Sequence, residues 1–180
     1  IIQEHYNPII RKIRNMEKPI VAAVNGIATG AGASIALCCD IVVATESASF
    51  IQAFSKIGLI PDCGGTYFLP RLIGMQRATA LMMTAEPISA TDAVEMGMIY
   101  KVFSDETFAD ESWKLVSKLS EMPTKALGLT KQLLNSSNSN DLERQLNMEE
   151  KCQVIAAETS DFKEGVQAFL EKRKANFKGE

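Results

Sequence analysis

The sequence predicts an α/β fold that is followed by an all-helical region. Two short apolar runs, residues 20–24 and 41–44, favour parallel strands that are covered on both faces, because such strands lack polar alternation. A small-residue loop and an apolar helix lie between them, which is the order of a parallel crossover unit. Beyond Asp105 only helical patterns remain. We therefore expect an α/β part over residues 1–104 and a helical part over residues 105–180.

The elements before residue 45 follow from spacing and composition. Apolar residues at helical spacing predict a first helix over residues 6–16. Pro19 opens the first strand, which continues directly into a glycine-containing loop at residues 25–32. Residues 33–39 are apolar and compact enough for a buried helix, and Asp40 precedes the second strand.

The middle of the chain is interrupted by turn-forming residues. Glycines and prolines break the apolar stretch at residues 50–70, and a long stretch of this kind predicts a functional loop. Residues 72–84 have a helical pattern. Ser89 with Asp92 is typical of a helix N-terminus, and residues 98–103 predict a last, shorter strand.

The C-terminal part predicts a series of helices. Amphipathic patterns cover residues 107–120 and 123–134, and a polar linker follows at residues 135–140. Asn140 with Glu143 is the first capping-box pattern, and Asp161 with Glu164 is the second. Apolar positions on these helices exceed what one α/β layer needs, which favours an oligomer; they are Leu142, Leu146, Ile155, Val166 and Phe169.

Composition excludes several classes of function. Nineteen basic and 22 acidic residues give a net charge of −3, which argues against an electrostatic grip on nucleic acid. No apolar run has the length of a membrane span. The four cysteines lack metal-site or redox spacing, and we expect them to be reduced in a cytoplasmic protein. The single histidine, His5, lies apart from any nucleophile motif, so we expect neither a histidine-based triad nor a metal site.

The glycine loop before the second helix can stabilise negative charge. Gly30 and Gly32 begin a dinucleotide-like pattern, but Ile35 stands where the third glycine would be, and no phosphate-binding Lys follows. Backbone N–H groups at a helix N-terminus can nevertheless face a developing oxyanion. The alternative is a tight strand-to-helix turn without a chemical role.

Asp62 is a single acid among apolar and turn-forming residues. It stands in the run Ile60-Pro61-Asp62-Cys63-Gly64. One interpretation is a turn aspartate that caps the next helix. The other is a partly desolvated carboxylate that transfers protons.

Four motifs together carry a resemblance to a known family. Residues 18–40, 60–66, 89–93 and 169–173 resemble the enoyl-CoA hydratase/isomerase (crotonase) superfamily over essentially the whole chain. The resemblance implies a ββα spiral core followed by C-terminal helices that assemble a homotrimer or a dimer of trimers. It also implies that the family's N-terminal part, with one of two oxyanion-hole amides, is missing from this sequence.

The resemblance implies roles for the residues around the loop. Ala31 would donate the oxyanion-hole N–H, and Gly30, Gly32 and Phe54 would line the substrate. The two glutamates of the hydratases are replaced by Ser34 and Phe54, which cannot supply a base and an acid for adding water. Asp62 matches the catalytic carboxylate of the isomerases, so an isomerase is favoured over a hydratase.

The resemblance also implies a substrate and its binding residues. Residues 52–62 are especially similar to the branch that isomerises ring-epoxide phenylacetyl-CoA in phenylacetate breakdown. Phe169 and Lys172 would hold the coenzyme A nucleotide of an acyl-CoA thioester, and their spacing predicts one shared helical face. We expect no cofactor besides the coenzyme A of the substrate. The alternatives are a Δ3,Δ2-enoyl-CoA isomerase or hydratase of fatty-acid β-oxidation, and a non-catalytic acyl-CoA-binding scaffold.

Overall fold

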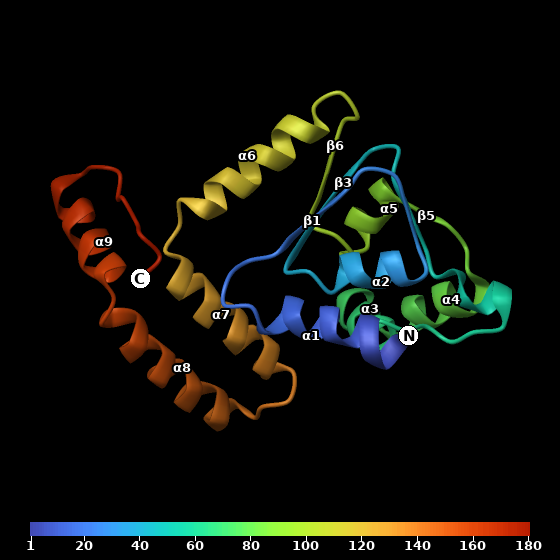
Figure 1. Ribbon diagram of the computed structural model, residues 1–180, viewed down its shortest axis with the longest axis horizontal. Helices are drawn as coiled ribbons and strands as arrows, with labels where there is room; N and C mark the ends of the chain where they lie inside the picture. The colour runs from blue at the N-terminus through green and yellow to red at the C-terminus, as the bar shows by residue number, and fades with distance from the viewer. The chain divides into compact units, whose positions relative to one another are not determined.

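The computed structural model describes residues 1–180 and divides into two compact units (Figure 1). The first unit comprises residues 1–14 and 20–114, and the second comprises residues 15–19 and 115–180. All strands lie in the first unit. The functional division into residues 1–104 and 105–180 stays a prediction.

The first sheet consists of three parallel strands. They are β1 (Val21–Val24), β3 (Ile41–Thr45) and β6 (Lys101–Phe103), in the order β1-β3-β6. The residues Val42 to Thr45 of the central strand are buried, as the unbroken apolar run predicted. The two first strands are therefore confirmed, and the third begins at Lys101, three residues later than expected.

The second sheet was not predicted. It consists of β2 (Ile27–Thr29), β4 (Ser49–Ile51) and β5 (Ile88–Ser89), with β2 parallel and β5 antiparallel to β4. Strands of two or three residues are too short to show a polar–apolar alternation in the sequence. The expected long loop at residues 50–70 is consequently shorter, because β4 and a 3₁₀ turn, η2 (Ala53–Ile57), occupy its beginning.

Five α-helices and one π-helical turn lie in the first unit, except that Asn15, the last residue of α1, belongs to the second unit. They are η1 (Ile2–Tyr6), α1 (Asn7–Asn15), α2 (Ala31–Leu37), α3 (Gly65–Ile73), α4 (Met75–Thr84) and α5 (Ala90–Glu95). The prediction of a single helix over residues 72–84 is wrong, because α3 ends at Ile73 and α4 begins at Met75. Gly74 has φ +81° and ψ 159°, and this conformation separates α3 from α4. The expected N-cap of α5 is confirmed, because the Ser89 side chain accepts a hydrogen bond from the Asp92 N–H.

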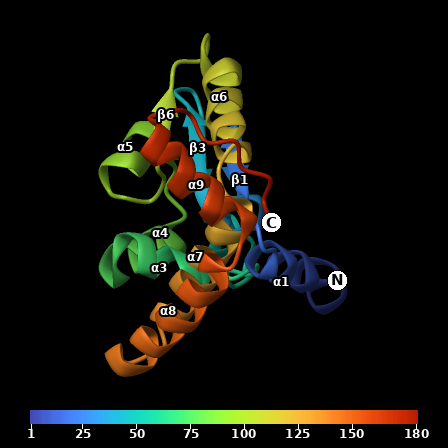
Figure 2. The ribbon, with the colours of Figure 1, turned by 90° about the vertical axis from the view of Figure 1, so that its left-hand side faces the viewer.

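The core of the first unit lies between its helices and its two sheets. Figures 1 and 2 both show α3 and α4 side by side. Side chains from α2, α3 and α4 meet those of β3 and β4 there, and the buried members include Leu37, Ala44, Phe50, Leu69 and Ile73. Removing such apolar surface from water stabilises the fold by about 25 cal/mol per Å². This core supports the turns that precede α2 and α3.

The second unit is helical, as predicted for the chain beyond Asp105. Helix α6 (Phe108–Ser120) begins in the first unit and ends in the second, and it is followed by α7 (Thr124–Ser137), α8 (Leu142–Ala157) and α9 (Ser160–Glu171). Helices α7 and α8 pack against each other as a hairpin (Figure 1). No helix of the chain is both long and apolar enough to cross a membrane.

Two of the predicted helix caps are wrong by one or two residues. Asp141, not Asn140, caps α8 and accepts from the Arg144 N–H. Thr159, not Asp161, caps α9 and accepts from the Phe162 N–H. In both places several capping residue types adjoin in the sequence, so propensity does not select among them.

Asp161 has a different role from the predicted one. Its buried carboxylate accepts hydrogen bonds from the backbone N–H groups of Lys178 and Gly179, at 2.6 and 2.8 Å. These bonds hold the end of the chain against the N-terminus of α9. Buried carboxylates need such partners, because an unpaired buried charge is costly.

Candidate active site

The loop between β2 and α2 is held against the end of β4. Gly30 has φ +53° and donates its N–H to the Ile51 carbonyl at 2.8 Å. A positive φ is readily adopted by glycine, because other residues have a Cβ that clashes there. Helix α2 begins at the next residue, Ala31. The first N–H groups of a helix have no acceptor within it, so Ala31 and Gly32 can present theirs to an anionic oxygen.

Phe54 packs directly beside this loop. It lies in η2 and is buried. A Cβ on Gly30 would be 3.8 Å from the Phe54 Cζ. The structure thus brings together Gly30 and Phe54, which the sequence predicted to line the substrate.

Ser34 connects α2 to the turn that carries Asp62. Its hydroxyl is 0% exposed and has no protein hydrogen-bond partner. A Cβ on Gly65 would lie 2.7 Å from the Ser34 Oγ and 3.4 Å from the Pro61 Cβ. Ser34, Pro61 and Gly65 therefore meet at one point, and Asp62 follows Pro61 directly.

Asp62 begins a turn of two left-handed residues. Cys63 has φ +52° and Gly64 has φ +77°. A non-glycine residue in this region costs about 1–2 kcal/mol, and such strain is often found at functional sites. The Asp62 carbonyl accepts from the Gly65 N–H at 2.8 Å, which closes the turn.

The Asp62 side chain does not cap the helix that follows. Helix α3 has Gly64 at its N-cap and no side-chain cap. The Asp62 Oδ1 is shielded from solvent and has no protein hydrogen-bond partner. The interpretation of Asp62 as a capping aspartate is therefore wrong.

The neighbouring Cys63 thiol is not a nucleophile. The pKa of Cys63 is raised to about 12, first by burial, then by the hydrogen bond that the thiol donates to the Asp62 carboxylate and by the repulsion between a thiolate and that carboxylate. A thiol with this pKa stays protonated near neutral pH, whereas nucleophilic cysteines react as thiolates. All four cysteines are free thiols.

Phe169 and Lys172 belong to the second unit, whereas the glycine loop belongs to the first. Phe169 is on α9 with 82% of its surface exposed. Lys172 is exposed as well, but it has φ +55° and follows the last residue of α9, Glu171. The prediction that Phe169 and Lys172 share one helical face is therefore wrong, because the left-handed residue ends the helix.

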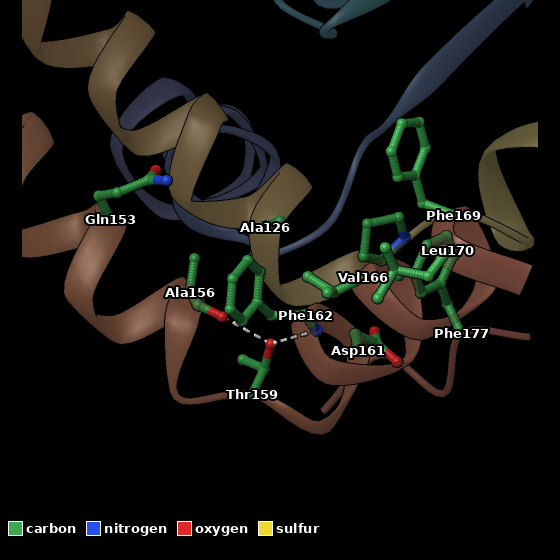
Figure 3. A pocket seen from close by; sticks show the side chains of 12 residues that line it. Ala126, Gln153, Ala156, Thr159, Asp161, Phe162, Val166, Phe169, Leu170 and Phe177 are labelled. Atoms are coloured by element: carbon green, nitrogen blue, oxygen red, sulfur yellow. Dashed lines mark hydrogen bonds between the residues drawn. The ribbon is translucent and has the colours of Figure 1, made fainter. Parts of the chain in front are cut away.

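Phe169 borders an apolar cavity of about 470 Å³ (Figure 3). Phe162, Val166 and Leu170 of α9 contribute to its lining, and Phe177 contributes from the chain after α9. Ala126 of α7 closes another side. The volume lies in the range of small-molecule sites.

The sequence did not indicate that two polar residues near the glycine loop, Ser34 and Gln52, would be buried without hydrogen-bond partners. Gln52 is 3% exposed, and neither its amide oxygen nor its amide nitrogen has a protein partner. The sequence points to Ser34 only as the residue that replaces a hydratase acid. A single polar residue within an otherwise apolar stretch was the available signal. The burial of Ser34 depends on contacts with Pro61 and Gly65, which are distant from it in the sequence.

Known proteins match this chain over its whole length. Residues 1–180 match the family described as enoyl-CoA hydratase/isomerase. The chain is 48% identical over 178 residues to the 1,2-epoxyphenylacetyl-CoA isomerase of Escherichia coli K12. The aligned region covers 99% of this chain and 68% of that protein. It is 43% identical over 180 residues to a protein of Rhodobacter capsulatus named probable enoyl-CoA hydratase. This aligned region covers 99% of this chain and 70% of the relative.

A solved structure supports the same assignment. The crystal structure of an enoyl-CoA hydratase from Polaromonas sp. JS666 has a TM-score of 0.93 and 38% sequence identity. The match covers 98% of this chain and 68% of that one. The predicted crotonase-like fold is confirmed by this likeness. The chain belongs to the enoyl-CoA hydratase/isomerase family.

Proposed function

We propose that the protein is an acyl-CoA isomerase that moves a double bond, or rearranges a ring epoxide, by a proton shuttle. The observation that carries this proposal is the state of Asp62. Its carboxylate is neither a helix cap nor part of a protein hydrogen bond at Oδ1, although that atom is shielded from water. A buried polar atom without a partner is rare and calls for a functional explanation.

Asp62 would act as both base and acid. Its carboxylate takes a proton from the carbon beside the thioester, and the electron pair left behind is delocalised onto the thioester oxygen as an enolate. The resulting carboxylic acid returns the proton two carbons further along the chain. The double bond then lies next to the thioester, and no atom has been gained or lost. Such positioned proton transfer contributes about 10²–10⁴ in rate.

The Ala31 N–H would stabilise the enolate oxygen. Gly30 and Gly32 flank this amide, and a Cβ at Gly32 would have no neighbour within 4 Å, so the chain's own packing does not demand glycine there. A close approach of the substrate to the backbone is a separate reason for glycine. One oxyanion-hole donor typically contributes about 10²–10³ in rate.

The absence of a second acid supports an isomerase over a hydratase. Ser34 and Phe54 stand where hydratases of the family carry glutamates, and both are buried. Adding water needs an acid and a base around the same double bond. Both hydratase and isomerase names nevertheless occur among the relatives, and a Δ3,Δ2-enoyl-CoA isomerase would use the same proton shuttle.

Phe169 and Lys172 would hold the coenzyme A nucleotide. The exposed Phe169 ring and the apolar cavity beside it offer a surface for the base. The exposed Lys172 ammonium can offer a point charge to a phosphate. In a trimer or a dimer of trimers, these two residues would contact the coenzyme A that is bound to a neighbouring copy of the chain.

The test is the isomerisation of a β,γ-unsaturated acyl-CoA, followed by the absorbance of the conjugated product. Asp62→Asn keeps the shape of the side chain and removes the base. We expect kcat to fall by at least about 10²–10³ and the affinity for acyl-CoA to change little. Asp110→Asn, an exposed acid at the start of α6, is the control and should keep wild-type turnover. Near-wild-type isomerisation by Asp62→Asn would show that another group is the base.

A further inference from the structure

Cys63 is a buried group that the proposed proton shuttle does not use. Its side chain is 2% exposed, and it follows the proposed base, Asp62, directly in the chain. The thiol donates a hydrogen bond to the Asp62 carboxylate, and it stays protonated near neutral pH because burial above all raises its pKa to about 12. Cys63 is therefore a constant donor beside the base rather than a second nucleophile.

The backbone at Cys63 does not favour a side chain. Cys63 has φ +52°, and Gly64 after it has φ +77°. Glycine adopts this left-handed region without the cost of about 1–2 kcal/mol that a residue with a Cβ incurs. A glycine would thus suit position 63 as it suits position 64. Either the packing of the sulfur or its hydrogen bond must compensate for this cost.

The two oxygens of the Asp62 carboxylate have different surroundings. Oδ1 is shielded from solvent and has no protein hydrogen-bond partner. The hydrogen bond from the thiol therefore falls on the other oxygen, Oδ2. The Asp62 carbonyl accepts from the Gly65 N–H at 2.8 Å, which holds the backbone of the turn but does not restrict rotation of the side chain. The thiol supplies that restriction and leaves Oδ1 unoccupied.

We infer that Cys63 is a positioning residue for the Asp62 base: its S–H group fixes the rotation of the carboxylate through Oδ2 and keeps Oδ1 available for the proton. This inference rests on the proposed function of Asp62. Groups that transfer protons need side chains around them that lock their orientation.

A thiol is a suitable donor for this purpose. A hydrogen bond to a carboxylate favours its charged form and thereby weakens it as a base. An O–H or N–H donor would do this more strongly than a thiol, which is a weak donor. Cys63 therefore orients the carboxylate at little cost in basicity.

The S–H stretching band tests the contact without catalysis. This band lies in a region of the infrared spectrum that is free of other protein bands, and Cys63→Ser or Cys63→Ala identifies the component that belongs to Cys63. Asp62→Asn should move that component to higher frequency, because an amide oxygen is a weaker acceptor than a carboxylate. Asp110→Asn should leave it in place. An unchanged Cys63 component in Asp62→Asn would overturn the inference.

Kinetics separates orientation from packing. Cys63→Ala keeps the Cβ and removes the donor, so kcat for a β,γ-unsaturated acyl-CoA should fall about three- to tenfold, while the Kd of a saturated acyl-CoA changes by less than about twofold. Cys63→Ser keeps a donor and should restore kcat to within about twofold of the wild type. As the stronger donor, Ser should also move the acid limb of the pH–rate profile to lower pH, which a packing role would not do.

The matched control is Cys152→Ala, which removes a buried thiol on α8 and should keep the wild-type kcat. Wild-type kcat in Cys63→Ala, or equal losses in Cys63→Ala and Cys63→Ser, would overturn the inference. Tm identifies a variant that fails to fold, and the infrared comparison of the wild type with Asp62→Asn then decides. Failure of the proposed function has a different signature, because Asp62→Asn would keep its turnover while the Cys63 band still shifts.

Discussion

The Ser34 hydroxyl occupies the space that a side chain at Gly65 would need. A Cβ at position 65 would be 2.7 Å from the Ser34 Oγ but 3.6 Å from the Ser34 Cβ. The hydroxyl alone therefore excludes a larger residue at the start of α3. Because the Asp62 carbonyl bonds to the Gly65 N–H, this contact also bears on the turn that holds the proposed base.

We expect Gly65→Ala to destabilise the fold by about 1–3 kcal/mol, because overpacking a buried site forces its neighbours to shift. In the Ser34→Ala background the same substitution meets only ordinary contacts, at 3.4 and 3.6 Å. Urea unfolding of the wild type, both single variants and the double variant gives the coupling energy. Additive effects would contradict the direct contact.

Acid should weaken the attachment of the chain after α9, because Arg173 and the Asn176 N–H bind the Glu164 carboxylate on that helix. Hydrogen bonds from Arg173 and from the Asn176 N–H lower the pKa of the Glu164 carboxyl from 4.5 to about 2. A lowered pKa in the folded state means that the stabilisation is complete above the ordinary value and is lost as the pH falls from about 4.5 to about 2. Glu164→Gln should lower Tm at pH 7 and lower it less as the pH approaches 2.

The control for the Glu164–Arg173 ion pair is Glu150→Gln, because Glu150 is an exposed carboxylate on α8. Its effect on Tm should show no such convergence over the same pH range. A constant difference between wild type and Glu164→Gln at every pH would contradict the role of the Arg173 ion pair.

Lys172 should contribute to the affinity for coenzyme A. Because it has φ +55°, Asn is a better test residue than Ala, since Asn enters the left-handed region more readily. Lys172→Asn should raise the Kd of coenzyme A about three- to tenfold at low salt, and less at high salt, because an exposed charge is screened. Lys163→Asn, on α9 itself, serves as the control. Equal affinities for wild type and Lys172→Asn would reject the phosphate contact.

The apolar faces of α8 and α9 should assemble copies of the chain. Five apolar side chains on these helices are exposed in the single chain, each over more than 40% of its surface: Leu142, Leu146, Ile155, Val166 and Phe169. Light scattering at micromolar concentration should give three or six times the 19.7 kDa of the chain. A monomer at that concentration would contradict the proposed assembly.

The sequence by itself determined the main strands, the helical C-terminal region and the family. An unbroken apolar run such as residues 41–44 is a local property, and so is the Ser89–Asp92 cap. The glycine loop and the Asp62 motif are likewise contiguous in the chain, which is why they identified the family before any contact was known.

Tertiary structure decided which candidate among similar neighbours has each role. It selected Thr159 over Asp161 as a cap, ended α9 before Lys172, and left Asp62 free of the capping role. It also brought Ser34 against Gly65 and buried Gln52 without a partner. The contact of Ser34 with Gly65 joins residues far apart in the chain, and the free energy of burying a polar atom is set by such contacts rather than by its sequence neighbours.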